Sequence, residues 1–242
     1  MESKGSSSAL WWRVVSLVGL AVLLSACRAP SSRQVQGISY NSQALNVDGR
    51  LDEQVYGTRP FTTELKPASR SGVAAPETKA WLWWNEGGLL FAFDARDERI
   101  ASAPPGQDEH AVDLQDRAEL FLWPEASQDY FCVEISPSGA VHDYSARIYR
   151  RFDDAWSPAG ARFAARPLPG GYAVEGFLPL SALRRMGVST WKAGTSFQLG
   201  LFRADFNPSD TRNPLWLTWI DPRLPQADFH VRGAFAPVIL LP

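Results

Sequence analysis

From about residue 37 to its end, the chain is a series of short apolar runs separated by turn-forming residues. About ten runs have the length and the apolar–polar alternation of strands, and clusters of Gly, Pro, Asn and Asp divide them. In the run 117–123, for example, Ala118, Leu120 and Leu122 would share one face. The ten runs are 79–84, 89–95, 117–123, 130–135, 141–144, 162–168, 171–178, 197–205, 215–219 and 234–241.

Only two segments, 51–56 and 181–186, have a helical pattern, and both are short. Ser181 is the expected N-cap of the second, and Gly187 follows its end. Many strands joined by tight turns, without long helices, predict an all-β fold. We therefore expect an antiparallel β-sandwich of two packed sheets, with about ten strands and one or two short helical turns.

The N-terminus has the pattern of a bacterial lipoprotein export signal. Positive charges at Lys4 and Arg13 come before or beside an apolar run at 14–24, which is too short to span a bilayer comfortably. The run ends in Leu24-Ser25-Ala26-Cys27, in which small residues before a cysteine form a lipobox. This predicts a lipoprotein signal peptide at 1–26 and lipidation of Cys27. An ordinary signal peptide that happens to precede a cysteine is the alternative.

The lipid on Cys27 defines the expected location of the protein. Two or three lipid chains hold a protein on a membrane stably. Arg28 rather than Asp follows the anchor, which favours the outer membrane in a cell that has two membranes. The prediction is a lipid-anchored protein of the cell envelope, facing the periplasm or the surface. Residues 27–36 would be the lipidated end and a polar tether, and 37–242 a single domain.

Composition excludes several classes of function. Without residues 1–26 the chain has 22 basic and 25 acidic residues, a net charge of −3, so we expect no nucleic-acid partner. No second apolar run is long enough to span a membrane, so membrane contact is expected through the lipid anchor only. Cys132 is the only cysteine besides Cys27, which excludes a disulfide framework. Its strand-like surroundings predict a buried, inert thiol.

Five segments form a recognisable series along the chain. They are 47–53 (VDGRLDE), 78–83 (TKAWLW), 116–121 (DRAELF), 172–179 (YAVEGFLP) and a closing part with Trp219-Ile220-Asp221-Pro222, Phe229-His230 and Phe235. In this order they resemble the family 9 carbohydrate-binding modules, over roughly residues 38–241. The resemblance implies an antiparallel β-sandwich that holds a sugar between aromatic side chains without catalysis. Bound calcium is common in this family, so the resemblance also implies calcium as a candidate cofactor.

The resemblance assigns roles to some residues and finds others replaced. The acidic residue that reads sugar hydroxyls falls on Glu119, and the aromatic of the closing loop falls near Phe229, where sugar-binding members have Trp. A first clamping Trp is replaced by Asp113, an Arg by Cys132 and a Gln by Gly200. A sugar site in this chain would therefore be rearranged.

Exposed aromatic rings beside polar groups are what a sugar site needs, because sugar C–H faces pack on flat rings. Trp219 ends a strand, and Trp156 lies in a loop beside two aspartates. With Phe229 these are the aromatic candidates for ligand binding, and Glu119 is the polar one. Core packing is the alternative for any single Trp.

Asp113 and Asp116 are the best candidates for a calcium-binding pair, although their segment lacks EF-hand spacing and a solvated acidic loop is the alternative. His110, His142 and His230 are scattered along the sequence, and no His-x-x-x-His pair occurs. We therefore expect no metal-dependent hydrolysis.

Other catalytic chemistry lacks its signature. Glycoside hydrolysis requires two carboxyls about 5–10 Å apart across a cleft. Glu119 and Glu175 could supply them, but both lie in alternating strands, and Glu175 is expected to have a structural hydrogen-bonding role. No enzyme activity is expected. No haem is expected either, because Met186, the one methionine after Met1, lies in a helical turn.

The combined prediction is a membrane-anchored lipoprotein that binds an oligo- or polysaccharide without catalysis, in support of carbohydrate catabolism. The alternative is an envelope scaffold or protein-interaction lipoprotein that kept the fold and lost the sugar site. The sequence identifies no protein partner.

Overall fold

The computed structural model describes residues 34–43, 45–69, 72–104 and 109–242. The predicted signal peptide, the predicted lipidation site Cys27 and most of the predicted tether lie outside the described residues. Internal contacts group Arg33–Pro242 into one compact unit. Among the described residues, no helix has the length and apolar character needed to cross a membrane.

The described residues form an all-β fold with thirteen strands, as the alternating pattern predicted, though with more strands than the ten runs. The strands are β1 Gln36–Tyr40, β2 Lys66–Pro67, β3 Thr78–Asn85, β4 Gly88–Arg96, β5 Arg117–Trp123, β6 Asp129–Ile135, β7 Val141–Arg147, β8 Arg151–Asp153, β9 Arg162–Leu168, β10 Gly171–Pro179, β11 Ser196–Asn207, β12 Asp210–Thr218 and β13 Ala236–Leu240. The helices are α1 Leu180–Arg185 and three 3₁₀ turns, η1 Gln54–Gly57, η2 Glu109–Leu114 and η3 Arg232–Ala234.

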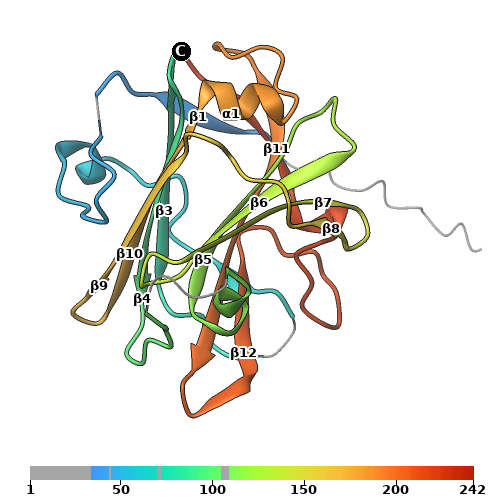
Figure 1. The fold of residues 1–242 in the computed structure, drawn as a ribbon. Coiled ribbons are helices and arrows are strands. Elements are labelled where there is room, and N and C mark those ends of the chain that lie inside the picture. The colour runs from blue at the N-terminus through green and yellow to red at the C-terminus, as the bar shows by residue number, and fades with distance from the viewer. Residues whose placement is uncertain (1–33, 44, 70–71, 105–108) are drawn as a thin grey trace, which may run out of the picture. The chain divides into compact units, whose positions relative to one another are not determined.

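The strands make one curled, mixed sheet rather than two separate antiparallel sheets. Along it the order is β8-β7-β6-β5-β11-β13-β1-β3-β4-β10-β9, and β12 with β2 extends from β11. Strand β1 joins the two halves, because its first residues pair with β13 and Ser39 and Tyr40 pair with β3, both in parallel. In Figure 1, β3, β4, β9 and β10 lie on one side and β5–β8 on the other. The expectation of two antiparallel sheets was therefore wrong at this junction, where one short strand has partners in both halves.

The main core lies between the two halves of the curled sheet. Leu82 and Phe93 come from one half, and Leu120, Val133 and Leu201 come from the other. Burial of this apolar surface is the main force that holds the halves together, which gives the fold its sandwich-like character. The predicted inward face of β5 is confirmed, since Ala118, Leu120 and Leu122 are all buried in this core.

The outer face of β5 is buried as well, which the alternating pattern did not indicate. Residues 219–235, which we call the closing segment, connect β12 to β13. Phe235 of this segment packs against Phe121 and Trp123 of β5, and Phe229 belongs to the same second apolar cluster. The closing segment therefore covers part of the outer face and leaves the rest as the wall of a pocket.

Two local predictions differ from the structure. Helix α1 begins at Leu180 after Pro179, whose side chain makes no capping hydrogen bond, so Ser181 is inside the helix and is not its N-cap. Pro179 is itself the N-cap residue, in an extended conformation (φ −68°, ψ 152°). The predicted runs 197–205 and 215–219 leave 206–214 outside the strands, but β11 continues to Asn207 and β12 begins at Asp210, which pairs with Asn207. Polar residues of this hairpin read as a loop, but backbone pairing continues through them.

Candidate functional site

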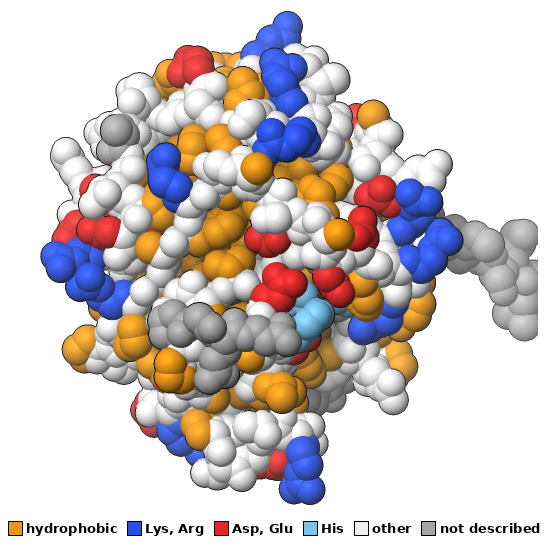
Figure 2. All heavy atoms as spheres, in the orientation of Figure 1, with side chains coloured by type: hydrophobic (Ala, Val, Ile, Leu, Met, Phe, Trp, Pro, Cys, Tyr) orange, Lys and Arg blue, Asp and Glu red, His pale blue; other side chains and the backbone are white. Residues whose placement is uncertain are grey.

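A pocket of about 350 Å³ lies on the outer face of the half-sheet that contains β5, β6 and β7. The closing segment, β8 and β12 contribute its walls. Its lining residues are His110, Asp113, Arg117, Glu119, Glu134, His142, Tyr144, Arg150, Phe152, Asp154, Trp216, Ala227, Asp228, Phe229 and His230. Figure 2 shows one face of the molecule, on which a histidine side chain lies among several acidic side chains.

Strand register places the polar residues of the pocket side by side. Glu119 of β5 is directly opposite Glu134 of β6, and Glu134 is opposite His142 of β7. Residues in register on neighbouring strands point to the same face of a sheet. Glu119, Glu134 and His142 are distant in sequence, but strand pairing therefore places them in one row on the same face.

Arg117, Glu119, Glu134 and Tyr144 form what we call the polar floor of the pocket, and all four are buried. Arg117 Nε lies 2.9 Å from Glu119 Oε1 and 2.5 Å from Glu134 Oε2. The Tyr144 hydroxyl donates a hydrogen bond of 2.6 Å to Glu134 Oε1. The guanidinium of Arg117 therefore contacts two carboxylates. The floor combines hydrogen-bond donors and acceptors within a small area.

Burial controls the protonation of the polar floor. Burial, followed by the charge of Glu134, raises the pKa of Glu119 well above its usual value, although Arg117 acts in the opposite direction. Burial lowers the pKa of Arg117, but the charges of Glu134 and Glu119 outweigh it, so the pKa of the guanidinium is raised. Arg117 therefore keeps its positive charge, and the protonated form of Glu119 is favoured.

Several atoms of the polar floor have hydrogen-bonding capacity left. Arg117 Nε, Glu119 Oε1 and Glu134 Oε2 are buried ion-pair atoms whose contacts lack the alignment of a hydrogen bond. Buried polar groups in proteins nearly always have partners, so atoms of this kind often mark a place where a ligand binds.

Aromatic side chains form the walls above the floor. Phe152 is 47% exposed and Trp216 is partly buried, whereas Phe229 is only 5% exposed. Phe229 stacks on Phe202, with ring centroids 4.2 Å apart and planes 17° from parallel. The Trp216 ring lies 5.4 Å from the Arg117 guanidinium carbon, a cation–π contact. Phe152 and Trp216 therefore offer more accessible ring surface than Phe229.

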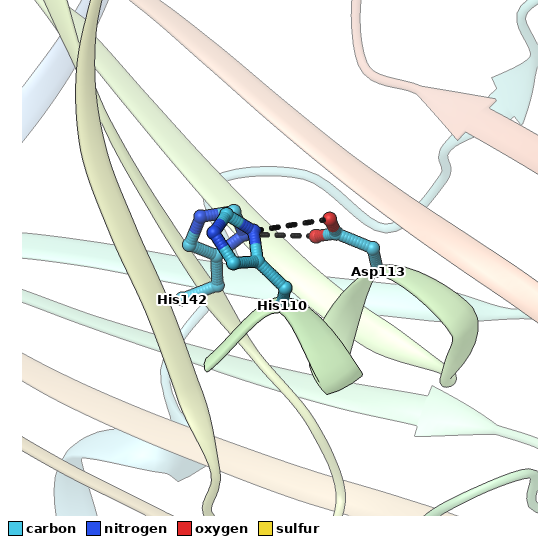
Figure 3. Close-up of side chains that lie close together, drawn as sticks. All are labelled: His110, Asp113 and His142. Carbon is cyan, nitrogen blue, oxygen red and sulfur yellow. Dashed lines mark hydrogen bonds and ion pairs between the residues drawn. The ribbon is translucent and has the colours of Figure 1, made fainter. Parts of the chain in front are cut away.

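His110, Asp113, His142 and Asp154 form a His–Asp cluster at the rim of the pocket. Figure 3 shows the first three of these side chains. His142 Nδ1 lies 2.8 Å from Asp113 Oδ1, a hydrogen-bond distance, and His110 Nδ1 lies 3.7 Å from Asp113 Oδ2. Burial lowers the pKa of His142, but the hydrogen bond and charge of Asp113 outweigh it, so this pKa is raised. Burial raises the pKa of Asp113, but His142 outweighs it and the pKa is lowered.

The histidines are scattered in the sequence, but they lie around one pocket in the structure. The chain has three histidines, and His110, His142 and His230 all line this one pocket. Their separation in sequence hides this, because η2, β7 and the closing segment converge only through the sheet register. His230 accepts or donates at Nδ1 with the Tyr130 hydroxyl, 2.9 Å away. Burial lowers the pKa of His230 to about 4, so this ring is neutral at neutral pH.

The structure brings together some of the predicted site residues and separates others. Glu119, Phe229 and Asp113 line the pocket. Trp219 does not line it and packs against Phe61 in the main core, with ring centroids 5.0 Å apart. Trp156 also lies at the edge of the main core, against Phe131 at 4.9 Å. Both tryptophans therefore pack against the main core, which was the alternative to ligand binding.

Asp113 and Asp116 do not form a pair, because they belong to two different clusters. Asp116 lies with Asp97 and Asp205, whose carboxylates both contact Arg203 at 3.1 Å. Burial, opposed by backbone hydrogen bonds, and then the charges of Asp97 and Asp205, raise the pKa of Asp116 to about 7. The structure therefore places the two carboxylates of the expected calcium pair in separate groups. Calcium binding itself stays a prediction.

Two positions where the resemblance implies polar sugar readers are filled by the apolar cluster. Cys132 is fully buried, as predicted, and lies in register between Phe121 and Tyr144. A side-chain carbon at Gly200 would lie 2.5 Å from the Phe202 ring. An Arg or Gln at these positions would have no room, so a ligand here must be read by other groups, of which Arg117 is the obvious one.

Glu175 has the structural role that the sequence indicated. Its carboxylate accepts hydrogen bonds from the backbone N–H groups of Asp48 and Gly49 and from the Tyr56 hydroxyl. Glu175 thereby fixes the segment 47–53 on β10, and it does not line the pocket. Glu119 and Glu175 are therefore not a pair of carboxylates across a cleft.

Comparison with known proteins gives matches among solved structures only. No protein-family model matches the chain, and no curated protein sequence matches it. A candidate carbohydrate-binding protein from Bacteroides uniformis has a TM-score of 0.63 and 14% identity, over 86% of this chain and all of that one. A family 9 carbohydrate-binding module from Caldicellulosiruptor kristjanssonii in complex with glucose has a TM-score of 0.59, with 17% identity over 86% of this chain and 95% of that one. The same type of module in complex with cellotriose has a TM-score of 0.58, with 18% identity over 86% and 94%. These similarities show a shared fold.

Proposed function

We propose that this domain binds a saccharide, without acting on it, in the pocket of β5, β6, β7 and the closing segment. The observation that carries the proposal is the combination in one pocket of a buried polar floor and partly exposed aromatic walls. Saccharides have hydroxyls that need donors and acceptors and C–H faces that pack on rings, so both parts of the pocket match them.

Each part of the pocket has a defined task in this proposal. Arg117 donates to hydroxyl oxygens, and Glu134 and Glu119 exchange hydrogen bonds with hydroxyl groups. Phe152 and Trp216 supply ring surface for a sugar face. At about 350 Å³ the pocket is near the lower end of the size range of ligand sites, which favours a short saccharide or a chain end.

The comparisons support the proposal and suggest the first probes. Modules of the same fold from Caldicellulosiruptor kristjanssonii hold glucose and cellotriose. At 17% and 18% identity these complexes support the choice of glucose and cello-oligosaccharides as ligands to test, and the replaced residues at Asp113, Cys132 and Gly200 favour a different set of contacts.

The carboxylates of the floor favour binding over hydrolysis. Glycosidases place two carboxyls on opposite sides of the scissile bond, about 5–10 Å apart. Glu119 and Glu134 lie on adjacent strands, on the same side of the pocket, and both contact the Nε atom of Arg117. This arrangement places both carboxyls around one guanidinium, whereas hydrolysis needs them on opposite sides of the bond.

One observation favours a second function, a scaffold or protein-interaction domain. Phe229, the aromatic expected to clamp a sugar, is stacked on Phe202 and buried. If the pocket binds no saccharide, the same closing segment would serve to present a protein-binding surface.

A glycan array probed with residues 33–242, with and without calcium, tests the proposal. We expect saturable binding to a small set of saccharides, confirmed by titration calorimetry, that weakens when Glu119 is changed to Gln. The variant keeps the size of the side chain and removes the acid, so circular dichroism should show an unchanged fold. A well-folded protein that binds no glycan on the array would overturn the proposal in favour of the scaffold function.

A further inference from the structure

We propose that the His–Asp cluster at the pocket rim binds one divalent transition-metal ion of the zinc type. The ligands would be His110, His142 through Nε2 and Asp154, while Asp113 would orient the His142 ring through Nδ1. This proposal does not depend on saccharide binding, because it uses none of the polar floor.

The donor atoms already lie close to the spacing that one ion requires. One ligand atom from each of His110, Asp113 and His142 lies within 4.8 Å of the other two. Asp154 lies 3.9 Å from Nε2 of each of the two histidines. Zinc binds nitrogen and oxygen at about 2.0–2.2 Å, so two donors on one ion are about 3–4 Å apart. The observed separations need only small side-chain movements to meet this.

The buried nitrogen of His142 is a second, independent observation. His142 is 5% exposed, and its Nδ1 is engaged by Asp113. Its Nε2 is buried, with no hydrogen-bond partner among the described residues, and its recorded neighbour is Asp154 Oδ1 at 3.9 Å. That distance is too long for a hydrogen bond. An ion pair between His142 and Asp113 gives Nδ1 a partner and leaves the buried Nε2 without one.

The contact between Asp113 and His142 has the form found around bound metals. Histidine ligands commonly donate their second ring N–H to a carboxylate, which fixes the ring and the tautomer. Here a proton on Nδ1 directed to Asp113 would leave a lone pair on the unpartnered Nε2. The side chains around the cluster are also accessible to an ion, because those of His110, Asp113 and Asp154 are 52%, 44% and 45% exposed.

The chemistry of the donors selects the type of ion. Imidazole nitrogens with carboxylates suit zinc, copper, nickel and iron, whereas calcium and magnesium prefer oxygen ligands alone. The nearest buried guanidinium, Arg117, is compensated by Glu119 and Glu134, so it does not oppose a cation at the rim. The second acidic cluster, Asp97 with Asp205, already holds Arg203 and has no histidine.

Zinc titration of untagged protein tests the proposal, with calorimetry and a competing chromophoric chelator as readouts. We expect one Zn²⁺ per chain, no displacement by excess Ca²⁺, and a higher melting temperature with Zn²⁺. His110→Ala, at an exposed position, should weaken binding by at least about tenfold, and Asp154→Asn by about tenfold. Asp153→Asn is the matched control, because Asp153 is an exposed neighbour outside the cluster.

Two results would overturn the proposal. One is the absence of saturable Zn²⁺ binding by folded protein, and the other is equal affinity in the wild type and the His110→Ala variant. Nitrogen-detected NMR of the imidazoles gives a readout independent of affinity, since Zn²⁺ should shift the His142 resonances and leave those of His230 near their original positions. Because Glu119→Gln leaves all four cluster residues intact, a failure of saccharide binding and a failure of metal binding are separable.

Discussion

Arg117 lies between two buried carboxylates, so the stability of the pocket depends on a single side chain. We expect Arg117→Met to lower the free energy of unfolding by about 3–5 kcal/mol, because it leaves Glu119 and Glu134 buried without their cation. Urea unfolding measures this loss. Arg212→Met is the control: its side chain is 88% exposed, so the change should be below about 0.5 kcal/mol. Equal effects of the two substitutions would contradict the importance of the polar floor.

His230 should make stability depend on pH. Burial, with help from Arg150, lowers its pKa to about 4 from an ordinary value near 6.5, although Asp228 acts in the opposite direction. The unfolded chain then binds more protons than the folded one between these values, so the contribution is complete above about pH 6.5 and is lost as pH falls towards 4.

The matched variant His230→Gln isolates this contribution from those of other groups. The difference in unfolding free energy between wild type and His230→Gln should fall by about 2 kcal/mol from pH 7 to pH 4.5, measured by urea unfolding at both values. A difference that does not change with pH would show that His230 titrates normally in the folded protein.

At the same scale, sequence patterns identified some pocket residues and missed others. Glu119 was found because a motif carried it, and Cys132 because it lies in an apolar run. Arg117, Glu134 and Tyr144 were missed, because polar residues that alternate with apolar ones in a strand are expected to face solvent. Their function depends on which strands are neighbours and in what register, and single-sequence periodicity contains no information on pairing.

At the scale of elements, β11 explains why position 200 cannot carry a polar side chain that reads a sugar. Gly200 and Phe202 lie on the same face of this strand, and a methyl group at Gly200 would lie 2.5 Å from the Phe202 ring. Gly200→Ala should therefore lower the free energy of unfolding by about 1–3 kcal/mol through overpacking. The loss should be smaller in a Phe202→Leu background, as a double-mutant cycle by urea unfolding would measure. Equal losses in both backgrounds would mean that the glycine is needed for another reason.

The strand pattern was reliable where one face meets the main core and unreliable where polar residues belong to strands. Alternation in β5 correctly gave Ala118, Leu120 and Leu122 as the inner face. The hairpin of β11 and β12 extends to the lower end of Figure 1, and its polar tip lies outside the predicted runs 197–205 and 215–219, although its strands continue to Asn207 and from Asp210. Short β1 was not expected at all, although it joins both halves of the sheet.

At the scale of the whole molecule, membrane anchoring through Cys27 stays a prediction from the lipobox. In a bacterial host with lipoprotein processing, the full chain should fractionate with the membrane, and Cys27→Ala should move it to the soluble fraction, because the lipid chains supply the membrane affinity. Metabolic labelling with a fatty acid gives the direct readout. Unlabelled wild-type chain would contradict the anchor and leave the pocket unaffected.

The all-β class followed from the pattern of runs and turns, but the pocket did not. It forms where η2, β5–β8, β12 and the closing segment meet, so its parts span residues 110–230. Long-range packing of this kind is what a linear pattern cannot express, and the convergence of all three histidines is its clearest result.

The most direct test of the proposed function is titration calorimetry of the best glycan-array ligand against wild type, Trp216→Ala and Trp219→Ala. Trp216 lines the pocket, whereas Trp219 packs in the main core against Phe61. We expect Trp216→Ala to weaken binding by about tenfold or more, corresponding to at least about 1.4 kcal/mol, and folded Trp219→Ala to bind as wild type does. Unchanged affinity in Trp216→Ala, with loss in Trp219→Ala, would place the saccharide elsewhere and contradict the account.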